Sequence, residues 1–132
     1  MKEKEIPFNR ILIIDDSEVD FFIANSILKK HKPSVSLYYA MDVDSALNML
    51  RSFKTSEVPD LILLDLNFER QSKQGLDFLK EFEKLYAGLD TQTKITVLTA
   101  FKGFQEAKVI ARDFSHTAIM EKPFSVEKLI SG

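Results

Sequence analysis

The segment Leu61–Asp65, with the sequence LILLD, joins four consecutive apolar residues to a carboxylate. A short apolar run without alternation is typical of a strand buried on both faces of a sheet. The segment Ile11–Ile14 (ILII), followed by Asp15 and Asp16, has the same pattern. If these two strands are parallel neighbours, three carboxylates meet at one edge of the sheet. Such crowding is costly unless a divalent cation or a proton offsets it, so the pattern indicates chemistry rather than packing.

The composition of the chain narrows its class. The 132 residues fit one domain, and we expect a single domain over 1–132 with its core at about 10–130. The net charge of −2 gives no electrostatic reason to expect nucleic acid or a membrane surface as a partner. The chain has no cysteine, which excludes disulfides and thiolate metal sites, and its apolar runs are shorter than the ~20 residues of a membrane span. We therefore expect a cytoplasmic protein.

Short apolar runs alternate with stretches of helical spacing along the chain. This alternation predicts an α/β fold: a doubly wound, five-stranded parallel sheet with helices on both faces. The first helix carries Phe22, Ile23, Ala24, Ile27 and Leu28, which we expect on its inward face. The expected strands are Arg10–Asp15, Ser36–Ala40, Leu61–Leu66, Ile95–Thr99 and Thr117–Met120, and the expected helices are Ser17–Lys32, Val43–Phe53, Gly75–Tyr86, Phe104–Arg112 and Ser125–Ile130.

Four short motifs follow one another at the ends of expected strands. They are Ile13–Ser17 (IIDDS), Leu63–Asn67 (LLDLN), Val97–Ala100 (VLTA) and Glu121–Phe124 (EKPF). Ligands of doubly wound sheets bind beyond the carboxyl ends of the strands, so the motifs converge on one site. Each motif alone is a weak signal. Because all four occur in this order, the chain, over about 10–129, resembles the receiver domain of two-component response regulators. That resemblance implies a chemotaxis-regulator-like, flavodoxin-like sheet with strand order 2-1-3-4-5.

The resemblance also implies roles for the carboxylates. Asp65 would be the phosphoacceptor, whose carboxylate attacks phosphorus and forms an acyl phosphate. Asp15 and Asp16 would hold Mg²⁺, with Asp65 and the backbone carbonyl of Asn67 completing the protein ligands. Hard oxygen ligands of this kind suit Mg²⁺.

Two further residues complete the implied machinery. Lys122 would bring a positive charge to the phosphoryl oxygens, and Thr99 would donate its hydroxyl to them. The donor would be a sensor histidine kinase or a histidine phosphotransfer protein. The module would catalyse only its own phosphorylation and dephosphorylation, so we do not expect an enzyme with an external substrate. The resemblance further implies a possible homodimer through the fourth helix, fifth strand and fifth helix.

The chain departs from the family pattern in two places. Ile119 stands three positions before Lys122, where the family usually has an aromatic switch residue. We therefore hypothesise that movement of the loop from Thr99 to Phe104 reports phosphorylation instead. The loop Asn67–Gln74 is also two residues longer than usual and polar. We expect it beside the predicted site, where it would alter the lifetime of the phosphoryl group or access of the kinase.

Two other functions stay open. A pseudo-receiver would use the same fold for interaction without phosphorylation, but the full residue set argues against it. A phosphohydrolase with an aspartyl nucleophile usually needs a second aspartate two residues later, where this chain has Asn67. The output is open as well, because the chain is either a stand-alone receiver or a piece of a longer regulator.

Overall fold

Five parallel strands form a single sheet in the computed structural model, which describes residues 6–65, 74–85, 93–99, 105–114, 117–122 and 124–131. The strand order is β2-β1-β3-β4-β5, which confirms the predicted flavodoxin-like topology. Every observed pairing is parallel. The strands are β1 (Arg10–Ile14), β2 (Ser36–Ala40), β3 (Leu61–Asp65), β4 (Lys94–Thr99) and β5 (Ala118–Glu121).

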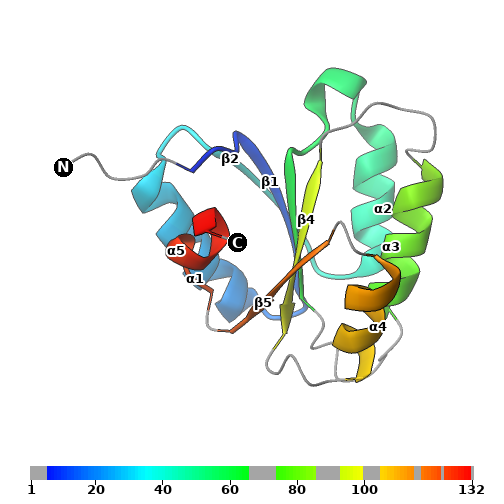
Figure 1. Ribbon diagram of the computed structural model, residues 1–132. Coiled ribbons are helices and arrows are strands. Elements are labelled where there is room, and N and C mark those ends of the chain that lie inside the picture. Colours follow the sequence, from blue (N-terminus) through cyan, green and yellow to red (C-terminus); the bar gives the residue numbers. More distant parts are fainter. Residues whose placement is uncertain are drawn as a thin grey trace.

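Helices cover both faces of the sheet. Figure 1 shows α1 and α5 on one face and α2, α3 and α4 on the other. The helices are α1 (Glu18–His31), α2 (Val43–Ser52), α3 (Gln74–Leu85), α4 (Gln105–Asp113) and α5 (Val126–Ser131). Predicted and observed bounds agree within one residue, apart from a short 3₁₀ turn at Thr55–Glu57 that was not predicted. In the part of the chain that the structure describes, no helix combines the length and apolar character that crossing a bilayer requires.

The apolar strands are buried on both faces because alternate side chains enter different cores. Ile11 and Ile13 of β1 pack in the cluster that includes Leu28 of α1. Leu12 and Ile14 pack in the opposite cluster with residues of α2, α3 and α4. This two-sided burial explains the unbroken apolar runs, and it places the ends of β1 and β3 in the middle of the sheet.

The inward face of α1 differs from the prediction. Phe22 and Ile23 are 65% and 53% exposed, so their expected burial was wrong. Ala24 and Leu28 are buried, with Ile27 partly buried beside them. Because each helical residue turns about 100° further, the two residues before Ala24 point progressively away from the sheet. The apolar count of this helix suggested a wide stripe, whereas only positions near the Ala24–Leu28 line face the core.

Candidate functional site

The ends of β1 and β3 bring two buried carboxylates together. Ile14 pairs with Leu64 in the parallel register, so the residues that follow them, Asp15 and Asp65, leave the sheet side by side. The Asp15 backbone N–H donates to the carbonyl of Ala40 on β2 at 3.0 Å, which fixes the turn out of β1. Both carboxyl groups are buried. The sheet therefore enforces the proximity that the sequence pattern predicted.

Lys122 lies directly over Asp65. Its Nζ is 3.2 Å from each of the two carboxylate oxygens of Asp65 and 3.4 Å from Oδ2 of Asp20. The backbone N–H of Lys122 donates to the carbonyl of Thr99 at 2.8 Å, which anchors the lysine to the end of β4. Thr99 itself is fully buried. The structure thus gathers Asp15, Asp65, Thr99 and Lys122, which the sequence motifs had named, at one edge of the sheet.

Asp20 is a third carboxylate at this edge, which the sequence motifs did not assign to the site. One oxygen each from Asp15, Asp20 and Asp65 lie within 4.8 Å of one another. Asp20 precedes Ala24 by four residues and Leu28 by eight, so it belongs to the stripe of α1 that faces the sheet. This helical spacing was the feature of the sequence from which the position of Asp20 could have been predicted.

The N-terminus of α1 links these carboxylates. Oδ1 of Asp15 accepts from the backbone N–H of Ser17 at 2.9 Å. The Ser17 hydroxyl oxygen in turn accepts from the backbone N–H of Asp20 at 3.2 Å, as an N-cap does. The cap holds the first turn of α1 against the end of β1, which directs the side chain of Asp20 toward Lys122.

The burial of these charges changes their proton affinity. Burial raises the pKa of Asp15 from its ordinary value of 3.8 to about 7; the Ser17 N–H and Lys122 act to lower it, and the nearby Asp65 carboxylate adds to the rise. Burial also acts to lower the pKa of Lys122, but Asp65, Asp15 and Asp20 together raise it above its usual value. Without a cation the site therefore keeps a charged lysine and leaves Asp15 protonated in about half of the molecules at neutral pH.

The donor set fits a hard divalent cation. The three clustered side chains offer only carboxylate oxygens, the ligands that Mg²⁺ prefers. A bound cation would also offset the repulsion between the buried carboxylates of Asp15 and Asp65. Asp16 is exposed and lies outside this cluster. Asn67, whose backbone carbonyl was the remaining predicted ligand, is outside the described residues.

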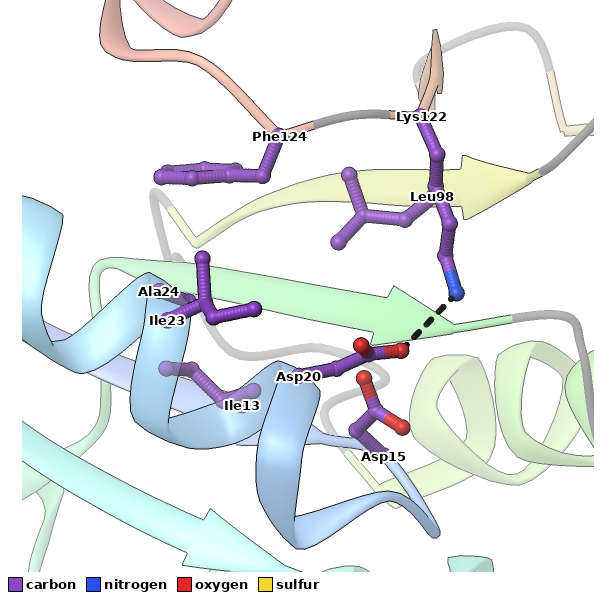
Figure 2. A pocket seen from close by; sticks show the side chains of 8 residues that line it. All are labelled: Ile13, Asp15, Asp20, Ile23, Ala24, Leu98, Lys122 and Phe124. Atoms are coloured by element: carbon purple, nitrogen blue, oxygen red, sulfur yellow. Dashed lines mark hydrogen bonds and ion pairs between the residues drawn. The ribbon is translucent and has the colours of Figure 1, made fainter.

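A pocket of about 420 Å³ opens beside the carboxylates, between α1 and the segment that follows β5. Figure 2 shows Lys122 and Asp20 joined across its charged end, with Phe124, Leu98 and Ile23 among the apolar side chains around the rest. The described residues that line the pocket are Ile13, Asp15, Asp20, Ile23, Ala24, Leu98, Lys122 and Phe124. The carboxylates and the lysine therefore lie at one end of a pocket whose other walls are apolar.

The two departures from the family pattern differ in what the structure describes. Ile119 is partly buried and packs against the core cluster on the α2, α3 and α4 face. The predicted long loop falls mostly on residues 66–73, outside the described ranges, and so does the segment 100–104 after Thr99. The hypothesis that this second loop reports phosphorylation stays a prediction.

Comparison with known proteins extends these observations. A family model described as the response regulator receiver domain matches residues 11–132. The aerobic respiration control sensor protein ArcB of Escherichia coli (strain K12) is 33% identical over 126 residues, which cover 94% of this chain and 14% of that protein. The chain thus spans about a seventh of the length of this curated relative.

Two solved structures share the fold. A response regulator receiver protein from Dyadobacter fermentans DSM 18053 has a TM-score of 0.76 and 22% identity, with 92% of each chain covered. A CheY-like receiver domain protein from Methanospirillum hungatei JF-1 has a TM-score of 0.71 and 22% identity, covering 93% of this chain and 88% of that one. At 22% identity these structural similarities support the fold alone. The assignment to a family rests on the match to the family model. The chain belongs to the response regulator receiver domain family.

Proposed function

We propose that the protein is a phosphorylation-switched receiver that takes a phosphoryl group onto Asp65 from a histidine kinase or a histidine phosphotransfer protein. The single observation that carries this proposal is the setting of Asp65. Its buried carboxylate ends the central strand β3, lies under Nζ of Lys122 at 3.2 Å and shares a cluster with Asp15. A nucleophile, an anion-binding cation and a metal-binding oxygen set thus lie within one small volume.

All the protein groups that the chemistry needs lie at this edge of the sheet. An oxygen of Asp65 attacks the phosphorus of the donor phosphohistidine, the new P–O bond forms as the P–N bond breaks, and the imidazole nitrogen keeps the electron pair. Lys122 faces the phosphoryl oxygens as a point charge, and Thr99 at the end of β4 supplies a hydroxyl donor. Hydrolysis reverses the state: water attacks phosphorus, the bond to Asp65 breaks, and inorganic phosphate leaves.

Asp65 suits the role of nucleophile better than Asp15. With its pKa at about 7, Asp15 is protonated in a large fraction of molecules near neutral pH when no cation is bound. Lys122 instead contacts both oxygens of Asp65 at 3.2 Å, where its charge would meet the oxygens of a phosphoryl group bound there. The two buried carboxylates therefore take different parts, one as acceptor and one as metal ligand.

Mg²⁺ is the proposed cofactor. Asp15 and Asp65 would hold it, with Asp16 and the backbone carbonyl of Asn67 as the further ligands that the family resemblance implies. When bound, the cation neutralises the crowded carboxylates and the charge on the transferring phosphoryl group.

The module modifies only itself, so its product is a signal. The related sensor protein ArcB supports a place in a phosphorelay, either as part of a sensor or as its partner. We propose one cytoplasmic domain that acts through protein contacts, and a homodimer through α4, β5 and α5 is one such contact. Comparing the size of the protein with and without phosphorylation tests that dimer.

The test is covalent labelling. Wild type incubated with acetyl phosphate and Mg²⁺ should gain the mass of one phosphoryl group, and Asp65→Asn should gain none. Asp44→Asn, which removes an exposed carboxylate from the first turn of α2, is the control and should label like wild type. Failure of wild type to label with acetyl phosphate and with phosphorylated histidine phosphotransfer proteins would favour the pseudo-receiver. Steady turnover of a phosphoester would favour the hydrolase.

A further inference from the structure

We infer that Asp20 is a positioning residue that competes with the phosphoryl group for Lys122 and thereby weakens the hold of the site on that group. The inference rests on the proposed phosphorylation of Asp65. It goes beyond it because it assigns a function to a side chain of α1 that neither accepts the phosphoryl group nor follows a strand.

The geometry shows Lys122 shared between two anions. Its ammonium group lies 3.2 Å from Asp65 and 3.4 Å from Oδ2 of Asp20, and Figure 2 shows the second contact at the charged end of the pocket. A phosphoryl group on Asp65 would place new negative oxygens beside this ammonium group. Asp20 would then both share Lys122, which contacts Asp65, and repel the incoming charge.

The position of Asp20 has no other sufficient explanation in helix stability. Ser17 already caps α1, using the backbone N–H of Asp20 and not its carboxylate. Glu18 supplies an exposed first-turn acid for the helix dipole. The carboxylate of Asp20 instead lies on the stripe of Ala24 and Leu28, where α1 faces the sheet, and an apolar side chain would be the ordinary choice there.

The solvent exposure of the two side chains sets the expected size of the effect. The Asp20 side chain is 45% exposed and that of Lys122 is 24% exposed, so water screens the pair in part. Pairs of this kind change an equilibrium by a modest amount, and we expect about a three- to fivefold effect on affinity for a phosphoryl mimic.

The experiment is titration with beryllofluoride at saturating Mg²⁺, followed by ¹⁹F NMR. Asp20→Asn should bind the mimic about three- to fivefold more tightly than wild type. Asp20→Ala, which has no side-chain acceptor for Lys122, is titrated in the same way. It covers the cases in which the amide oxygen introduced by Asp20→Asn still binds Lys122 or in which Asp20→Asn folds poorly. Glu18→Gln removes the same charge from the same turn of α1 and should bind like wild type. Asp20→Glu should restore the weaker wild-type affinity.

A double-mutant cycle shows whether the effect passes through the lysine. In a Lys122→Ala background, Asp20→Asn should no longer tighten binding. An equal gain in both backgrounds, or no gain in either, would overturn the inference while leaving the phosphoacceptor role of Asp65 intact. If wild type bound no beryllofluoride at all, the proposed function itself would fail, and this inference with it.

Discussion

Two ion pairs of this molecule look alike in their atoms and differ in their surroundings. Arg112 and Asp113, at the end of α4, approach to 2.8 Å and 3.2 Å in a two-pronged contact. Lys122 approaches Asp65 only to 3.2 Å. The surface pair is shorter, yet its side chains are 72% and 47% exposed, whereas those of Lys122 and Asp65 are 24% and 2% exposed.

The difference teaches that burial, rather than distance, gives a charge its consequences. Water around Arg112 and Asp113 screens their attraction, and either partner can lose the other at little cost. Asp65 is buried beside Asp15 and in contact with Lys122, so water screens the charges of these groups from one another much less. Charged groups that are shielded from water in this way can act on a substrate or a bound ion.

The largest expected effect is on the pH dependence of stability in the absence of Mg²⁺. The folded pKa of Asp15 is about 7, above its ordinary 3.8, so the folded protein binds this proton more tightly than the unfolded chain. This contribution is fully present below about pH 4 and is lost as the pH rises through about 7. Urea unfolding in EDTA should show a fall of about 2–4 kcal/mol over that window.

Asp15→Asn should flatten the fall, since the amide cannot titrate. Asp113 provides the opposite sign: hydrogen bonding to Arg112 lowers its pKa, so its contribution is present above its ordinary pKa and is lost as the pH falls. Asp113→Asn should leave the window from pH 4 to 7 unchanged. A flat wild-type profile in EDTA would mean that burial does not govern Asp15.

The second effect compares removal of the two basic side chains, Lys122 and Arg112. Lys122→Ala removes the ammonium group that contacts the buried carboxylate of Asp65, and this should lower the free energy of unfolding by about 2 kcal/mol in EDTA at pH 8. Added Mg²⁺ should recover part of it. Arg112→Ala is the matched control and should unfold at the same urea concentration as wild type. Equal destabilisation by both substitutions would contradict the contrast between the two pairs.

The sequence predicted much of this arrangement and missed a definite part. The apolar runs that end on Asp15 and Asp65 were sufficient for the sheet and for the meeting of the two carboxylates, because parallel strands place their carboxyl ends together. Motif order was sufficient for the family. Both signals lie in contiguous stretches of sequence.

The missed part depends on the rotation of one helix. Counting apolar residues put Phe22 and Ile23 on the inward face of α1, whereas the structure turns them to solvent and turns Asp20 toward the site. The abundance of apolar side chains in this helix hid which line of them faces the sheet, since several rotations bury a similar number. Only packing against the sheet selects one rotation, and that choice gives the site its third carboxylate.

The smallest effect is on Mg²⁺ affinity. A proton on Asp15 competes with the cation for the same oxygens, so affinity should be nearly constant above pH 7 and fall by up to about tenfold for each unit below it. Calorimetric titration at pH 6, 7 and 8 measures this directly. Asp15→Asn should bind weakly at every pH, and Asp113→Asn should follow wild type because its carboxylate stays in water. An affinity that did not change between pH 6 and 8 would show that the buried carboxylate is already ionised, and the surface and buried pairs would then differ less than their exposure implies.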